Sequence, residues 1–294
     1  MTYPNPLAEE ALTDAEDQYL VRCVQSGSKE ALELLIARHQ RWIYNIALRM
    51  VCLPQDAEDA TQEVLIKLLT KLSTFRGESQ FRTWLYRLVI NHLLNMKRAR
   101  AEAKEMTFED YGRELDSTPE ADLAAPDSQR PDAQLLIEEA KIGCTSAMLL
   151  CLTREQRLVY VLGEIFGVTD RVGAELLDIS RDSFRQKLAR ARRDLYNFMQ
   201  GKCGLVKASN PCRCAKKMQG FIQLGYLDPQ NLLFVRERMV QVREVTEKRS
   251  EQLDAFYDAY AEIHRNHPFH NSPDFVASLR SLIERTNFQS AFEA

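Results

Sequence analysis

Apolar residues recur along most of the chain at intervals of three and four, the spacing of one face of an α-helix, and few segments alternate as strands do. In the first hundred residues this pattern predicts four helices, at about 14–25, 29–51, 55–73 and 79–100. Pro54 stands where the third helix begins, a position that suits proline. The pattern therefore predicts an all-α fold.

The helical pattern stops between residues 101 and 134, where Asp, Glu, Pro and Ser dominate. This composition predicts an acidic, flexible linker. About 34 residues could span roughly 110 Å when extended, which exceeds the ~70 Å of two turns of duplex DNA. The linker could therefore join two domains that act on separate DNA sites.

Helical spacing resumes after the linker, at about 135–151, 153–166, 170–177 and 181–199. A cysteine-bearing loop follows Gly201, and three amphipathic helices are predicted beyond it, at 229–249, 250–265 and 273–288. The predicted organisation is two small helical domains, an acidic linker and a helical carboxy-terminal extension. The expected bounds are 14–100, 101–134, 135–200 and 201–294.

Length and composition fit this organisation, since 294 residues with 45% hydrophobic and 28% charged residues are typical of a soluble chain of two small domains. No apolar run is long enough to span a bilayer, and the first residues lack the features of a secretion signal. We therefore expect a cytoplasmic protein without membrane insertion. The net charge of −3 confines any nucleic-acid binding to local basic surfaces.

One such surface is predicted between residues 76 and 100, where basic residues are interleaved with Trp84 and Tyr86. Cations bind phosphates, and flat rings stack on bases that have left the duplex. The alternative is that the polar stripe is only solvated and Trp84 is a core residue, which we favour for Trp84 alone. The candidate DNA-binding residues here are Arg76, Arg82, Trp84, Arg87, Asn91, Asn95 and Arg98.

A second basic surface is predicted on a helix-turn-helix, formed by 170–177, a turn at 178–180 and a long helix from Arg181. Ser180 is a good N-cap, and Arg or Gln near the start of such a helix can reach base edges in the major groove. The alternative is a solvated basic helix on a helical bundle. The candidate residues are Arg181, Arg185, Gln186, Lys187, Arg190 and Arg193.

The third predicted helix carries a polar, mostly acidic face, made of Asp56, Asp59, Gln62 and Glu63. Acidic side chains near a helix amino terminus stabilise the helix dipole, which is the simplest explanation. They would also form a negative patch able to dock a positive protein surface.

These segments together resemble the sigma-70 family of bacterial transcription initiation factors, in its short, extracytoplasmic-function type. Region two is matched by GSKEALELLIARHQRWIYNIA, DAEDATQEVLIKL and FRGESQFRTWLYRLVINHLLN, and region four by LTREQRLVYVLGEIFG and ISRDSFRQKLARARRDL. The resemblance implies that the acidic face binds core RNA polymerase. It also implies that Arg76 to Arg98 melt and hold the minus-ten element, capturing a flipped base, and that the helix from Arg181 reads the minus-thirty-five element.

The sequence departs from the family pattern in the first helix of the DNA-reading motif. Val172-Gly173-Ala174 stands where Glu-Ile-Ala is common, and Asp178 stands where the turn usually has Gly. Because Gly in a helix costs about 1 kcal/mol relative to Ala, we expect a loosened motif or an unusual DNA element.

The extension contains Cys203, Cys212 and Cys214, which could share a metal ion such as zinc, with His264, His267 or His270 as a fourth ligand. The alternative is ordinary reduced cysteines, because no Cys-x-x-Cys pair is present. The family itself requires no cofactor.

The predicted function is that of a sigma factor that directs promoter recognition, DNA melting and transcription initiation, with a carboxy-terminal tail that regulates it. The predicted partners are core RNA polymerase, promoter DNA and an anti-sigma factor, and no enzymatic activity is expected. The alternative is a stand-alone helix-turn-helix regulator, which leaves the acidic helix and its basic, Trp-bearing neighbour without a function.

Overall fold

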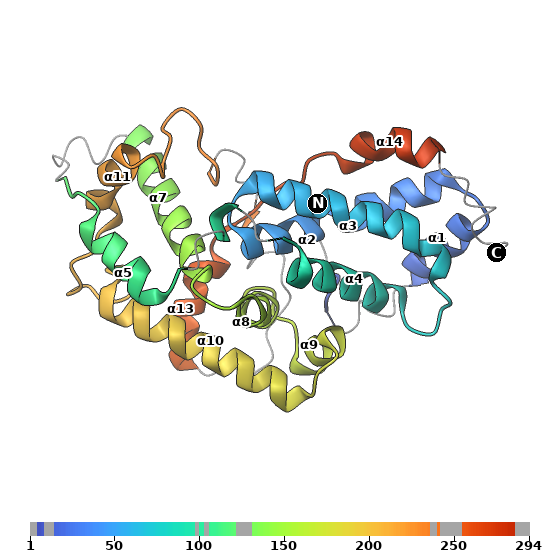
Figure 1. The fold of residues 1–294 in the computed structure, drawn as a ribbon, viewed down its shortest axis with the longest axis horizontal. Helices are drawn as coiled ribbons and strands as arrows, with labels where there is room; N and C mark the ends of the chain where they lie inside the picture. Colours follow the sequence, from blue (N-terminus) through green and yellow to red (C-terminus); the bar gives the residue numbers. More distant parts are fainter. Residues whose placement is uncertain are drawn as a thin grey trace.

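The computed structural model describes residues 5–8, 15–97, 100–102, 106–121, 131–235, 240–241 and 255–285. The chain is mostly helical, as predicted (Figure 1). The helices and strands are α1 (Ala15–Gln25), α2 (Lys29–Val51), α3 (Pro54–Lys71), η2 (Leu72–Thr74), α4 (Phe81–Asn95), η3 (Arg100–Glu102), α5 (Phe108–Ser117), α7 (Pro131–Leu149), α8 (Arg154–Tyr160), η4 (Val161–Ile165), α9 (Asp170–Leu177), α10 (Arg181–Lys202), α11 (Cys214–Gln223), β1 (Val240–Gln241), α13 (Ala255–Arg265), β2 (Pro268–Phe269) and α14 (Phe275–Arg285).

Helices α1 to α4 form an amino-terminal bundle, and local signals set their ends. The Ser28 hydroxyl caps α2 by accepting the Ala31 N–H, and Gly27 precedes it with a φ of 97° that suits glycine. Pro54 opens α3 as the sequence predicts. α2 is buried along nearly its whole length, because it packs against α1, α3, α4 and α14.

Helices α8, α9 and α10 pack together and form the helix-turn-helix domain, whereas α7 packs mainly on α11. The α9 bounds, Asp170–Leu177, agree with the predicted helix, and α10 starts at Arg181 with Ser180 as its cap. α8 continues into one π-helical turn, η4, whose residues are all buried. Buried residues of this domain and of the amino-terminal bundle belong to one connected hydrophobic cluster, so the two groups of helices are packed against each other.

The stretch predicted as linker contains a helix, α5. Thr107 and Asp110 form a capping box, and Tyr111 and Leu115 are buried against the rest of the fold. The rings of Phe108 and Tyr111 lie 5.3 and 5.7 Å from the Phe198 ring of α10. Residues 108–117, an acidic segment with apolar residues four apart, therefore form a docked helix rather than extended chain.

The tail (residues 203 to 285) differs most from prediction. The helix predicted at 229–249 is wrong for the residues described in that range, because 229–235 are irregular and 240–241 form β1. The buried Glu139 carboxylate of α7 accepts hydrogen bonds from the backbone N–H groups of Leu233, Phe234 and Val235. These N–H groups therefore do not bond to carbonyls one turn earlier, as they would in a helix. α11 was not predicted, whereas α13 and α14 lie within the predicted helices.

The end of the tail crosses between the two groups of helices. A strap, defined here as residues 266–274, leaves α13 beside the helix-turn-helix domain, passes α2 and leads into α14, which packs on α2 (Figure 1). β2 lies in the strap and pairs antiparallel with β1, with Val240 opposite Phe269. Within the described part of the chain, the helices lack the length and apolar character needed to cross a membrane.

Candidate nucleic-acid interface

A groove between α3 and α4 brings together four of the predicted DNA-binding side chains: Trp84, Arg87, Asn91 and Asn95. Its cavity holds about 410 Å³. Lys67 and Lys71 of α3 line the opposite wall, and the sequence analysis missed them. Their spacing of four residues on an exposed face was the available signal. Glu63 and His92 also line the groove. It therefore combines cations, amides and an indole ring with a single carboxylate, which suits a single strand with unstacked bases.

Trp84 belongs both to the core and to this groove. Its ring lies 5.4 Å from Phe75 and 5.9 Å from Phe81, so one side packs in the aromatic core of the bundle. The ring is only partly buried, and it contributes to the groove wall. A ring held on one side and open on the other is a rigid platform for a base.

Arg82, by contrast, is buried and ion-paired with Asp17 of α1. His39 Nε2 lies 3.1 Å from the same carboxylate. Burial alone would raise the pKa of Asp17, but hydrogen bonds and charges from His39 and Arg82 outweigh it and hold this pKa well below its usual range. Arg82 thus joins α4 to α1, which does not fit the predicted DNA contact. Arg98 lies outside the described residues.

A second cavity, of about 540 Å³, lies between α1 and the loop from Phe75 to Phe81. Arg76 is exposed in this loop, and Gly77 adopts a φ of 74°, which favours glycine. Gln25 Nε2 donates to the Phe75 carbonyl at 3.2 Å and holds the loop against α1. The loop therefore forms one wall of a preformed polar pocket.

The acidic helix α3 exposes three of its four predicted residues, Asp59, Gln62 and Glu63, on one face. Asp56 is 7% exposed and lies in the first turn, where a carboxylate stabilises the helix amino terminus. The structure therefore leaves the first three available to a partner, whereas Asp56 fits the alternative of helix stabilisation.

The departures in the helix-turn-helix have a steric explanation. A Cβ atom at Gly173 would lie 2.3 Å from Cε2 of Phe184, so the ring of α10 packs where a side chain on α9 would be. Asp178 ends α9 in the left-handed conformation, with φ 54° and ψ 47°, which Asp tolerates better than most residues. Glycine at 173 thus permits close packing of the two helices, and the expected loosening is not seen.

The cationic side chains of α10 are mostly paired with acids of the same domain. Arg181 and Arg185 both bind the Asp170 carboxylate, the first at 3.0 Å. Lys187 lies 2.5 Å from Glu155, and Arg193 lies 3.4 Å from Asp194. The two other predicted residues, Gln186 and Arg190, are exposed. The helix therefore presents a row of polar side chains that neighbouring carboxylates hold in place.

The two predicted DNA-binding elements touch each other. Arg87 of α4 donates from Nε and Nη2 to the Glu175 carbonyl of α9, at 3.0 and 2.8 Å. A second contact joins the two groups of helices: the buried Arg157 of α8 donates to the Met50 carbonyl of α2, and it bonds to Glu102 at 2.7 Å. One of the predicted DNA contacts is therefore occupied by the other domain.

The predicted metal site is not formed. Cys203 and Cys212 are neighbours in a parallel backbone bridge, but in the part of the chain that the structure covers no three His, Cys, Asp or Glu side chains are arranged to hold a metal ion. Burial raises the pKa of all three thiols, that of Cys214 to about 12. His264, His267 and His270 are instead buried around the strap.

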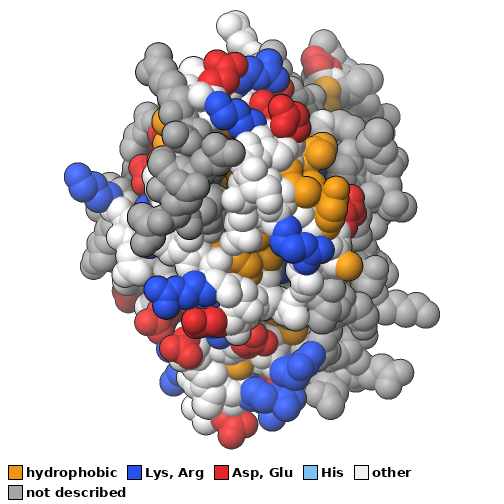
Figure 2. Space-filling view, turned by 90° about the vertical axis from the view of Figure 1, so that its right-hand side faces the viewer, with side chains coloured by type: hydrophobic (Ala, Val, Ile, Leu, Met, Phe, Trp, Pro, Cys, Tyr) orange, Lys and Arg blue, Asp and Glu red, His pale blue; other side chains and the backbone are white. Residues whose placement is uncertain are grey.

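Charges are mixed on the face seen in Figure 2, which views the molecule from the right of Figure 1. Basic and acidic side chains alternate over its described surface. Nucleic-acid binding on this acidic chain therefore has to rely on local features such as the α3–α4 groove.

Comparisons with known proteins agree with this geometry. The family model for sigma-70 region 2 matches residues 35–103, which hold most of the amino-terminal bundle. The RNA polymerase sigma-H factor of Pseudomonas aeruginosa is 32% identical over 192 residues, which cover 64% of this chain and 96% of that protein. The ECF RNA polymerase sigma-E factor of Escherichia coli strain K12 is 30% identical over 185 residues, covering 63% and 94%.

A solved structure, described as CnrH in complex with the cytosolic domain of CnrY, is 24% identical, covers 63% of this chain and 97% of that chain, and has a TM-score of 0.43. The relatives match along nearly their full lengths, whereas about a third of this chain is left over as a carboxy-terminal extension.

Proposed function

This chain belongs to the extracytoplasmic-function group of the sigma-70 family of RNA polymerase sigma factors, and on that premise we propose how its residues divide the work of initiation. As a sigma factor it binds core RNA polymerase and is not itself an enzyme. The stand-alone regulator is set aside, because the family match falls on the bundle that this alternative left without a function.

The exposed face of α3, with Asp59, Gln62 and Glu63, docks a positive surface of core RNA polymerase. The exposure of all three side chains to solvent supports this assignment. Asp56 acts within α3 as a stabilising first-turn carboxylate.

The groove between α3 and α4 holds the melted minus-ten strand. Trp84 offers a stacking surface, and Asn91 and Asn95 offer amide groups that can bond to base edges. Lys67 and Lys71 neutralise phosphates from the opposite wall. The 540 Å³ cavity beside Arg76 is large enough for one flipped base.

Helix α10 reads the minus-thirty-five element in duplex DNA. Gln186 and Arg190 are exposed for base or phosphate contacts. Arg181 and Arg185 are oriented by Asp170, which keeps their guanidinium groups near the start of the helix.

The observation that carries the proposal is the direct contact between the two DNA-binding elements. Two promoter elements separated by about two turns of duplex lie ~70 Å apart, yet Arg87 of α4 bonds to Glu175 of α9. The protein therefore opens before it engages a promoter, and the structure represents a closed resting form. The tail regulates this step, because α13, the strap and α14 contact both groups of helices. A separate anti-sigma partner stays a prediction.

The test is transcription by bacterial core RNA polymerase with this protein on a template pool in which both promoter elements are randomised, followed by sequencing of the transcripts. Asn91→Ala should change only the minus-ten preference, and Gln186→Ala only the minus-thirty-five preference. Asp59→Lys should abolish both by weakening core binding. Gln223→Ala, an exposed change on α11, is the matched control. Unchanged preferences in the first two variants would refute the assignment of those residues.

A further inference from the structure

The strap contacts both groups of helices. Just before it, at the end of α13, His264 pairs with Tyr160 of α8 at 3.1 Å, and at its start His267 pairs with Thr145 of α7 at 2.6 Å. From Pro268 onward the chain lies against α2, to which it stays close until α14. A segment of about ten residues thus joins two parts of the fold that initiation has to separate.

The α2 face beneath the strap binds its backbone. Asn45 Nδ2 donates to the His270 carbonyl at 2.8 Å, and the His270 N–H donates to Asn45 Oδ1 at 3.0 Å. One turn further along, Arg49 Nη2 donates to the Pro268 carbonyl at 3.0 Å. One amide side chain that both donates to and accepts from the same residue imitates the pairing of a neighbouring β-strand.

Arg41 extends this row by one turn in the other direction, and its Nε donates to the His270 carbonyl at 3.3 Å. Residues 41, 45 and 49 are four apart, so they share one face of α2. Burial lowers the pKa of Arg49 to about 9, as expected where the strap excludes water from its guanidinium. This face is therefore polar, buried and directed at main-chain atoms.

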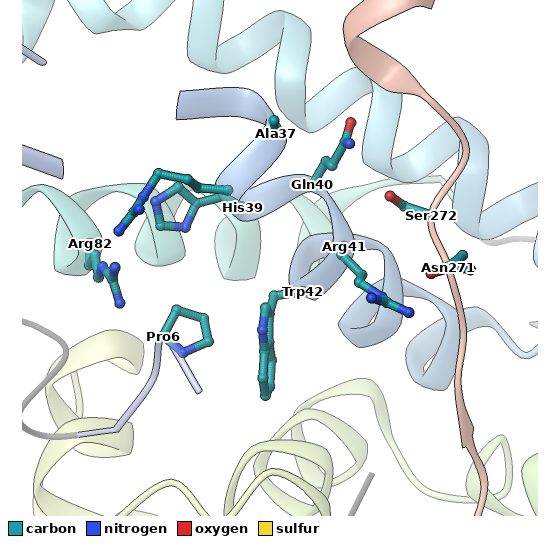
Figure 3. A pocket seen from close by; sticks show the side chains of 10 residues that line it. Pro6, Ala37, His39, Gln40, Arg41, Trp42, Arg82, Asn271 and Ser272 are labelled. Carbon is teal, nitrogen blue, oxygen red and sulfur yellow. The ribbon is translucent and has the colours of Figure 1, made fainter. Parts of the chain in front are cut away.

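A single aromatic anchor seats the strap. Phe269 is fully buried, its ring centre 5.0 Å from that of Trp42, and the Arg41 guanidinium lies 5.3 Å from the Phe269 ring centre. Trp42 in turn lies 5.3 Å from Phe166, at the end of η4. Trp42, Asn271 and Ser272 are among the residues that line a cavity of about 430 Å³. Figure 3 shows Asn271 and Ser272 on the strap, beyond Arg41 as seen from Trp42.

We infer that the α2 face formed by Arg41, Trp42, Asn45 and Arg49 is a groove for an extended peptide with one aromatic anchor, and that the chain's own strap occupies it as an intramolecular latch. The occupant is the strap because the tail continues along α2, where Lys29 donates to the Glu284 carbonyl at 2.6 Å. The inference rests on the proposed function in one respect, that the open form is the one that binds polymerase.

The experiment uses the full chain, in which Trp42 and Trp84 are the two tryptophans. In a Trp84→Phe background, acrylamide quenching of Trp42 reports whether the strap is seated. Phe269→Ala removes the anchor, and Asn45→Ala removes the two-way bond to His270. Phe221→Ala is the matched control, because it removes another buried ring of the tail, from α11, which packs on α7.

Both variants, Phe269→Ala in the strap and Asn45→Ala on α2, should make Trp42 markedly more accessible to acrylamide. Without the Trp84 change, they should bind core RNA polymerase about tenfold more tightly, because a larger fraction of the protein is in the competent form. A synthetic peptide of residues 264–273 should protect Trp42 again in Phe269→Ala, whereas a scrambled peptide should not. Phe221→Ala should leave both quantities unchanged.

If the strap variants keep Trp42 as protected as in the parent, the latch is wrong. Asn45→Ala decides the matter if Phe269→Ala fails to fold, as judged by circular dichroism. If Trp42 becomes accessible and the peptide protects it but no form binds core polymerase, the peptide groove stands and the proposed function fails. Tighter polymerase binding without a change at Trp42 would place the regulation elsewhere and overturn the latch.

Discussion

Acidification should open the closed form, because three histidines are buried where the tail packs on the two groups of helices: His264 at the end of α13, and His267 and His270 in the strap. Burial, together with the nearby charge of Arg49, lowers the pKa of His264 to about 4, and Arg49 and Arg41 act likewise on His270, also at about 4. The pKa of His267 is well below its usual value, through burial and the charges of neighbouring histidines, Arg49 and Lys141 of α7. The charged groups that act on these rings are thus cations.

The sign and size follow from proton linkage. The closed form binds fewer protons than an open form in which each pKa returns to 6.5, so closure is fully stable above pH 6.5 and weakens as pH falls toward 4. Between pH 7.5 and 5.5 each such histidine costs the closed form about 1.35 kcal/mol. His264 and His270 together cost about 2.7 kcal/mol, a shift of about 100-fold in the opening equilibrium.

The assay is acrylamide quenching of Trp42 in the Trp84→Phe protein between pH 7.5 and 5, with excited-state lifetimes measured so that direct quenching by protonated histidine is separated from exposure. The exposure of Trp42 to acrylamide should rise as the pH falls, with a midpoint set by the equilibrium constant between the closed and open forms at neutral pH. His264→Gln with His270→Gln should flatten most of this dependence, since glutamine keeps a polar side chain that does not titrate. A protein whose Trp42 is equally protected at pH 7.5 and 5.5, with unchanged circular dichroism, would refute the reasoning.

Three further predictions concern single side chains. Gly173→Ala should destabilise the helix-turn-helix domain by about 1–3 kcal/mol in urea unfolding, because its Cβ would lie 2.3 Å from the Phe184 ring. Adding Phe184→Leu should recover part of this loss. An unchanged urea midpoint in Gly173→Ala would show that the ring moves freely. Asp17→Asn should cost about 3–5 kcal/mol in thermal unfolding, because it leaves Arg82 buried without its carboxylate; a small loss would mean that Arg82 reaches water. Lys67→Ala and Lys71→Ala should each weaken the salt dependence of binding to a minus-ten single strand, by about 0.7 in the slope of log affinity against log salt concentration. Lys29→Ala, whose amine bonds to the Glu284 carbonyl, should leave this slope unchanged. An unchanged slope in the first two variants would remove both lysines from the interface.

Local signals were sufficient for the elements that carry the family motifs. Ser180 and the apolar stripe of the following helix predict the start of α10 at Arg181, and α9 agrees with its predicted bounds. These elements have strong caps and clear periodicity, so tertiary contacts do not alter them. The groove residues Trp84, Arg87, Asn91 and Asn95 share a helical face in the sequence, which is why the structure brings them together.

The remaining errors arise where distant residues supply the partner. Arg82 has the sequence context of a DNA contact, yet its position is decided by Asp17, 65 residues earlier. Residues 233–235 look helical, but Glu139 takes their N–H groups from 94 or more residues away. The pairing of Asn45 with His270 spans 225 residues. Periodicity describes neighbours along the chain, so it cannot reveal such contacts.

The chemistry of the strap explains why it can act as a reversible latch. When the strap leaves α2, the two Asn45–His270 bonds and the Arg49–Pro268 bond are exchanged for bonds to water. This exchange costs about 0.5–1.5 kcal/mol for each neutral bond. Exposing Phe269 adds about 1.5–3 kcal/mol. A groove lined only with apolar side chains would hold the strap more permanently and would leave a sticky surface when open. A polar row with one aromatic anchor instead gives the closed form a free-energy advantage of a few kcal/mol. Protonation of two histidines, or a competing contact with polymerase, supplies enough free energy to reverse it.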